Sequence, residues 1–151
     1  MDTGKELVKL LEAQKRHYRA LKDVVVRQTT HIEAMDVGAL ASDTAEVRGL
    51  MRKVRDMEVS IRPLRQSWGT MGLDRAPADR RRVETVVGAV RSTVEEIQEI
   101  KDRNATMLQD RMVDLKKQMA GLEHQGKAAH AYYGPPRNAG ATPSKFIDQS
   151  T

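Results

Sequence analysis

Three glutamates fall within five residues of one another, at Glu95, Glu96 and Glu99, where carboxylates could hold a metal ion. Di-metal sites in helical bundles need a Glu-x-x-His motif from each of two helices, however, and the sequence contains no such motif. It also has no cysteine, no glycine-rich phosphate loop and no nucleophile elbow. His17 and His31 are isolated histidines, which we interpret as ordinary flanking residues of a helix. We therefore predict that the protein is not an enzyme and has no metal site and no cofactor.

The eight methionines are the more informative group. Met112 and Met119 alternate with Leu115 and Leu122 at steps of three and four residues, so the four side chains would share one face of a helix. Methionine fills irregular gaps in a core, and it is also frequent on adaptable binding surfaces. Core packing is the general interpretation of the methionines. For Met112, Leu115, Met119 and Leu122 we predict instead the floor of a groove that binds an apolar helix of another protein.

The elements that must position these residues are long helices. Apolar residues recur along most of the chain at steps of three and four, the spacing of one helix face. The three expected seams comprise Leu7, Leu11, Gln14, Tyr18, Leu21, Val25, Gln28, Ile32 and Met35; then Leu40, Val47, Leu50, Val54, Met57, Ile61, Leu64 and Trp68; then Val83, Val86, Val90, Val94, Ile97, Lys101, Asn104 and Leu108. Lys101 and Asn104 predict a polar layer that fixes the register of the third helix. With 3% aromatic and 31% charged residues, the composition is typical of long helices.

These patterns predict an all-α fold, a three-helix antiparallel coiled-coil bundle with a long third helix and a disordered C-terminal tail. The helices are expected to span about residues 4–35, 37–68 and 75–131. Candidate N-caps are Thr3 with Glu6 for the first helix, Asp36 (or Asp43, if the helix starts later) for the second, and Asp74 or Asp79 for the third. Pro63 is expected to kink the last turn of the second helix, which Gly69 and Gly72 would close.

Residues 1–133 are predicted to form a helical coiled-coil domain, followed by a flexible tail over residues 134–151, where glycine and proline concentrate. The apolar stretch from residue 83 to residue 122 alone exceeds the first two helices, of about 30 residues each, by roughly two to three turns, so the predicted groove needs something to cover it. Phe146 and Ile147, an apolar pair in the otherwise polar tail, are expected to fold back over that groove.

The net charge of +5 is spread along the chain, and Arg80, Arg81 and Arg82 form its one basic cluster. Interspersed signs are typical of a solvated helix surface, whereas a nucleic-acid-binding protein carries a stripe of one sign. The N-terminus is charged, and no stretch of the sequence is long and apolar enough for a membrane span. These features predict a cytoplasmic protein that neither binds nucleic acid nor inserts directly into a membrane.

Four stretches of the chain carry a family pattern. They are residues 34–40, which contain the break between the first two helices; residues 62–73, which end in a Gly-Leu loop; residues 101–108, centred on Asn104; and Tyr132-Tyr133-Gly134, followed by a Gly/Pro tail with Phe146-Ile147-Asp148. Together these stretches resemble the FlgN family of flagellar export chaperones, and the resemblance extends over nearly all 151 residues. Pro63 and the arginine triplet have no counterpart in the family pattern.

The resemblance implies a cytoplasmic chaperone that binds an amphipathic C-terminal helix of hook-associated (hook–filament junction) flagellar proteins and delivers them to the flagellar type III export gate. It also implies that a tyrosine near the end of the third helix docks on the cytoplasmic domain of the export-gate membrane protein. Tyr132 and Tyr133 both match that position. The seams themselves leave open whether the protein is a monomer or a dimer.

Two other functions fit the same seams. One is a self-associating structural coiled-coil protein, and the other is a basic helical nucleic-acid-binding module. The salt dependence of binding distinguishes the nucleic-acid-binding module from a chaperone. Phosphate contacts weaken steeply as ionic strength rises, whereas the binding of an apolar helix is little affected.

Overall fold

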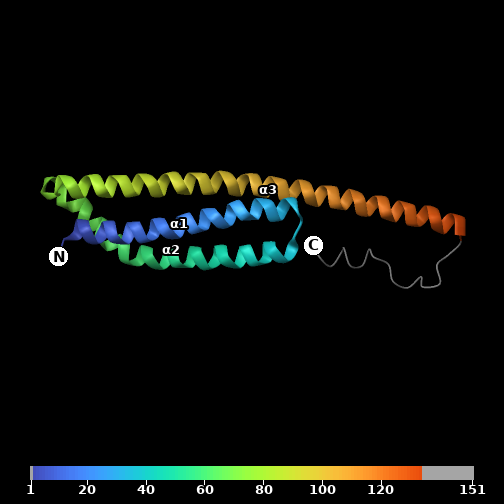
Figure 1. The fold of residues 1–151 in the computed structure, drawn as a ribbon, viewed down its shortest axis with the longest axis horizontal. Coiled ribbons are helices and arrows are strands. Elements are labelled where there is room, and N and C mark those ends of the chain that lie inside the picture. The colour runs from blue at the N-terminus through green and yellow to red at the C-terminus, as the bar shows by residue number, and fades with distance from the viewer. Residues whose placement is uncertain (1, 134–151) are drawn as a thin grey trace. The chain divides into compact units, whose positions relative to one another are not determined.

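The computed structural model describes residues 2–133. Within them the chain forms three α-helices and one short 3-10 helix: α1 (Thr3–Glu33), α2 (Val37–Met71), η1 (Gly72–Asp74) and α3 (Pro77–Tyr133) (Figure 1). The all-α fold with a long third helix is therefore confirmed. The chain divides into two units, Met1–Gln109 and Asp110–Thr151, and α3 contributes to both. The tail predicted for residues 134–151 lies outside the described residues.

The helix α1 is capped by Asp2, and the prediction of Thr3 as the N-cap is wrong. Oδ1 of Asp2 accepts a hydrogen bond from the Gly4 amide at 3.1 Å. The Asp2 backbone is extended (φ −88°, ψ 109°), as an N-cap requires, whereas Thr3 already belongs to the helix. A carboxylate also interacts more favourably than a hydroxyl with the positive end of the helix dipole, which explains the preference.

A tight connection reverses the chain between α1 and α2. Ala34 ends α1, Met35 adopts a left-handed backbone conformation (φ 50°), and Asp36 caps α2 by accepting a hydrogen bond from the Ala39 amide at 3.1 Å. This geometry confirms Asp36 as the cap of the second helix. Because the connection is so short, α1 and α2 pack side by side in opposite directions (Figure 1).

The helix α2 continues through Pro63 to Met71, past the end predicted at residue 68. Proline removes one backbone hydrogen bond, but Pro63 is exposed and the helix persists on both sides of it. Ile61 and Trp68, which are 0% and 8% exposed, anchor α2 in the core before and after the proline. The helix closes at Gly72, whose backbone (φ 54°, ψ −122°) suits a residue without a Cβ atom.

Two apolar clusters hold the first unit together. The first contains Leu7, Leu11, Ile61, Trp68, Val83 and Val86, where the start of α1 meets the end of α2 and the start of α3. In the second, Leu21, Val25 and Ile97 pack with the half-buried Val47 and Leu50 of α2. Both clusters therefore draw on all three helices, as a bundle requires, and apolar burial of this kind is the main favourable term in folding.

The seam of α3 differs from the prediction at two positions. Val94 is 39% exposed and Lys101 is also exposed, whereas Thr93 and Ile100 are half-buried. The predicted seam took two successive steps of four residues, from Val86 through Val90 to Val94. Each such step turns the helix about 40° past a full turn, so two in a row leave the packed face. The observed seam keeps the strict alternation of steps that holds a face against its neighbours.

Asn104 supplies the polar layer that the spacing predicts, although Lys101 does not share it. The Asn104 side chain is 6% exposed. Its Nδ2 donates to the Val25 carbonyl at 2.9 Å, and its Oδ1 accepts from the Thr29 hydroxyl at 2.7 Å. Both ends of the amide are thus satisfied by α1, and a satisfied polar residue in a seam fixes the register of the helices that it joins.

In the second unit, the described residues form the C-terminal part of α3, which ends at Tyr133. Every residue from 110 to 131 is exposed. Leucine, lysine, glutamine, methionine and alanine dominate the first half of this segment, and all are strong helix formers. None of the helices in the described part of the chain combines the length and the apolarity needed to cross a bilayer.

Candidate functional site

The second unit carries a line of apolar side chains that we call the α3 strip: Met112, Leu115, Met119 and Leu122. These side chains are 49%, 48%, 37% and 66% exposed, respectively. Val86 and Ile97, on the packed face of the same helix, are only 1% and 6% exposed. Steps of three and four residues place the strip on one helix face, as predicted. An exposed line of large apolar side chains is typical of a partner-binding site.

Polar residues surround the α3 strip and make this segment amphipathic. Charged side chains flank it at Arg111, Lys116 and Glu123, whereas Asp114 and Lys117 lie on the outer face of the helix, and all five are exposed. The two methionines of the strip are unbranched and flexible, so they can adapt to partners of different shape. The arrangement can therefore bind the apolar face of a helix while polar contacts form at the rim.

The predicted docking residues Tyr132 and Tyr133 end α3. Their backbone belongs to the same helix as the α3 strip, while their side chains lie outside the described part of the chain. Phe146 and Ile147, which are predicted to cover the strip, lie outside the described residues altogether. The arginine triplet, Arg80 to Arg82, is exposed in the first turns of α3.

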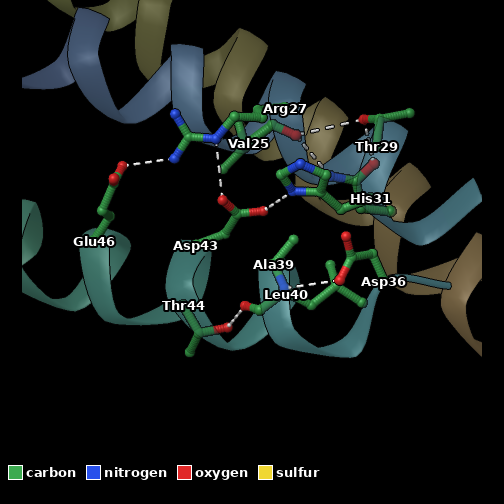
Figure 2. Close-up of polar contacts among 11 residues, drawn as sticks. Val25, Arg27, Thr29, His31, Asp36, Ala39, Leu40, Asp43, Thr44 and Glu46 are labelled. Atoms are coloured by element: carbon green, nitrogen blue, oxygen red, sulfur yellow. Dashed lines mark hydrogen bonds and ion pairs between the residues drawn. The ribbon is translucent and has the colours of Figure 1, made fainter. Parts of the chain in front are cut away.

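An ionic cluster around the buried Asp43, near the α1–α2 connection, was not predicted (Figure 2). Asp43 of α2 is 2% exposed and points toward α1. Its Oδ1 accepts a hydrogen bond from Arg27 Nε at 3.0 Å, and its Oδ2 lies 2.5 Å from His31 Nδ1. An ionised carboxylate can only accept, so His31 donates through Nδ1. Arg27 also donates to Glu46 at 2.7 Å, which ties it to α2 a second time.

The surroundings of Asp43 hold the pKa of its carboxyl group below the ordinary value. Burial alone acts to raise that pKa, but hydrogen bonds from His31 and Arg27, together with the charges of both groups, outweigh it. The sequence did contain a signal for this residue. Asp43 lies between Leu40 and Val47, at the one position where the predicted apolar seam of α2 skips a step. It serves as a seam residue that links two helices, not as the alternative helix cap.

A further polar layer joins α1 to α2 at Gln14, which the seam predicts as a polar interruption. Gln14 is 4% exposed and donates to Glu58 at 3.1 Å, and Arg65 donates to the other carboxylate oxygen of Glu58 at 2.7 Å. Burial, followed by the negative charge of Glu58, raises the pKa of the neighbouring Tyr18, and Arg65 acts in the opposite direction. The hydrogen bonds of this layer join side chains of the bundle to one another, so the layer serves packing. In residues 2–133, no three acidic or histidine side chains gather closely enough to hold a metal ion.

Comparison with known proteins decides between the functions that the seams leave open. The model of the family described as FlgN protein matches residues 1–140, a range that includes every described residue. The chain belongs to the FlgN family. It is therefore a flagellar export chaperone that binds flagellar proteins. Neither the curated proteins nor the solved structures include a match to the chain.

The two units of this FlgN chain differ in what their side chains contact. In the first unit, Asp43, Asn104 and Gln14 each form a hydrogen bond to a residue of another helix. In the second, the α3 strip has large apolar side chains without cover among the described residues. A chaperone needs such a surface, so the strip is the candidate site for a flagellar protein.

Proposed function

We propose that this FlgN-family chaperone binds an amphipathic C-terminal helix of a hook–filament junction protein along the α3 strip. The observation that supports the proposal is the exposure of Met112, Leu115, Met119 and Leu122 at helical spacing on one face. A client helix would place its apolar residues against the strip and keep its polar face in water. Removal of apolar surface from water favours such an association by about 25 cal/mol per Å².

Substitution of Met119 with glutamate tests this proposal. Met119 lies in the middle of the strip and is its least exposed member, at 37%. In the Met119→Glu variant, a charge would have to be buried beneath the client helix without a partner, so we expect client binding to be abolished. Isothermal titration calorimetry with a peptide of the client's C-terminal helix measures the affinity, and circular dichroism shows whether the bundle remains folded.

Ala120 offers a matched control for this experiment. It is the next residue along the chain, it is exposed, and the helix turns it about 100° away from Met119. The Ala120→Glu variant adds the same charge beside the strip, and we expect it to bind the client much as the parent does. If Met119→Glu bound the client as tightly as the parent, the binding surface would lie elsewhere.

We further propose that the chaperone delivers its client in the cytoplasm to the flagellar type III export gate, and that Tyr132 or Tyr133 docks on the cytoplasmic domain of the gate protein. Both tyrosines end the helix that carries the strip, and a phenol ring combines an apolar body with a polar tip. Tyr132→Ala and Tyr133→Ala, made singly, separate the two candidates. The variant that lacks the docking tyrosine should no longer bind the gate domain but should keep its affinity for the client. If both single variants and the double variant still bound the gate domain, this role would be refuted.

A further inference from the structure

The seam of the α3 strip continues beyond Leu122 to two small residues. With the same alternating steps it comprises Met112, Leu115, Met119, Leu122, Gly126 and Ala129, all of them exposed. A seam with this alternation is the pattern of a two-stranded coiled coil. Its large residues occupy the first four positions and its small residues the last two, so the two ends of the seam differ in bulk.

We propose that residues 110–133 pair with the same segment of a second copy of this chain as an antiparallel two-helix coiled coil. In each of the two central layers, Met119 of one copy would face Leu122 of the other. Further out, Leu115 would face Gly126 of the second copy, and Met112 would face Ala129. A large side chain opposite a small one at each end gives layers that can interdigitate without voids. The two-fold axis would then pass between residues 120 and 121.

Two charged residues select this register. Lys116 and Glu123 are exposed and follow Leu115 and Leu122, so both lie on the same flank of the seam. Equivalent flanks face each other in an antiparallel pair, and in this register Lys116 lies opposite Glu123 of the second copy, twice. A shift by one heptad in one direction would set Lys116 against Lys116, and a shift in the other would set Glu123 against Glu123. Like charges at these positions oppose pairing.

A parallel pair fits the same residues less well. Opposite flanks then meet, which would bring Arg111 against Lys116 of the second copy at two places. Each seam residue would also face the same residue of the second copy, so Gly126 would face Gly126 and Ala129 would face Ala129. An end of the seam built only from such small residues would be poorly filled. Both charge and volume therefore favour the antiparallel arrangement.

Charge reversal tests the proposed dimer, and it does so with no client present, so the result is independent of the proposed function. The first measurement is sedimentation equilibrium of the full chain at low ionic strength, up to about 0.5 mM, where we expect a monomer–dimer equilibrium. Lys116→Glu and Glu123→Lys each convert two attractive pairs into two repulsive ones. Each variant should weaken the dimer by about tenfold.

The double variant K116E/E123K restores both pairs with their signs exchanged, so its dissociation constant should return to that of the parent. A mixture of the K116E and E123K chains should form a heterodimer in which all four charges are matched. Lys117→Glu is the control, because it changes the net charge by the same amount on the outer face of the helix. We expect the K117E chain to dimerise as the parent does.

Spin labels test the direction of the two helices, since the chain has no cysteine of its own. Ala131→Cys and Ala120→Cys each place one label outside the seam. In the antiparallel dimer, the labels at residue 131 should be roughly 30 Å apart or more, and those at residue 120 much closer to each other. A parent chain that stays monomeric, single charge variants that dimerise like the parent, or a short distance between labels at residue 131 would each overturn the proposal.

Discussion

Gly4 of α1 lies at a point where α2 and α3 both approach it closely. A Cβ atom at Gly4 would be 2.9 Å from Cζ3 of Trp68 in α2 and 3.1 Å from Cβ of Asp79 in α3. All three residues are buried. Spacing along one helix does not show which residue of another helix lies opposite, so the sequence alone did not predict this contact. Lack of space, and not backbone conformation, is what requires glycine at this position.

We expect Gly4→Ala to lower the free energy of unfolding by about 1–3 kcal/mol, the usual range for overpacking a well-filled site. The indole ring of Trp68 is rigid and only 8% exposed, so it can move aside only by disturbing the first apolar cluster. This cost exceeds the gain of about 0.5–1 kcal/mol that alanine brings to a helix. Urea unfolding followed by circular dichroism measures the difference.

Gly49 provides the matched control for that substitution. It lies within α2, is exposed, and would have no atom within 4 Å of an added Cβ. Gly49→Ala should therefore raise the free energy of unfolding by about 0.5–1 kcal/mol through helix propensity alone. If Gly4→Ala were stabilising to the same extent, the three helices would not be packed as closely at that point as the structure indicates.

Among the elements, α3 shows where prediction from periodicity fails. The steps of the predicted α1 seam alternate without interruption, and those of the α2 seam do so from Val47 onward, after the gap that Asp43 fills. In α3 several valines lie near one another, so the spacing alone allowed Val94 or Thr93 to follow Val90. Apolarity favoured Val94, whereas packing selects Thr93, whose hydroxyl bonds to the Ala89 carbonyl of its own helix at 3.0 Å. A polar residue that satisfies itself locally can occupy a seam without a partner helix.

The contact between α3 and α1 at Asn104 leads to a prediction about the coupling of two elements. Because Asn104 accepts a hydrogen bond from Thr29 at 2.7 Å, the effects of Asn104→Ala and Thr29→Val on stability should not add. We expect a coupling of about 0.5–1 kcal/mol in a double-mutant cycle, with Asn104→Ala alone costing about 1–2 kcal/mol. Equilibrium urea unfolding of the four chains provides the measurement.

Thr93 allows a control cycle within the same helix. Its hydroxyl bonds only within α3, and it lies eleven residues, or roughly 16 Å, from Asn104. Thr93→Val and Asn104→Ala should therefore be additive to within about 0.3–0.5 kcal/mol. Additivity in the Thr29 cycle as well would show that the hydrogen bond across the helices does not fix the register.

For the molecule as a whole, the sequence predicts the three helices and an apolar surface on the third that its neighbours do not cover. The length of the third seam supports both, because a helix of 57 residues exceeds its partners of 31 and 35. The ionic cluster at Asp43 was beyond such reasoning, since it depends on which residues of α1 lie opposite one carboxylate. That residues 1–133 behave as one domain stays a prediction, and the boundary at Gln109 suggests how to test it.

A chain that ends at Gln109 should keep the stability of the first unit and lose the client. No residue from 110 to 131 is buried, so their removal takes nothing from either apolar cluster. At a concentration where the full chain is monomeric, we expect the melting temperature to change by less than about 4 °C, which corresponds to about 1 kcal/mol or less. Calorimetry with the client peptide should show no binding, whereas a chain that ends at Tyr133 keeps the α3 strip and should bind. A large fall in the melting temperature of the shorter chain would mean that the first unit needs the rest of α3 in order to fold.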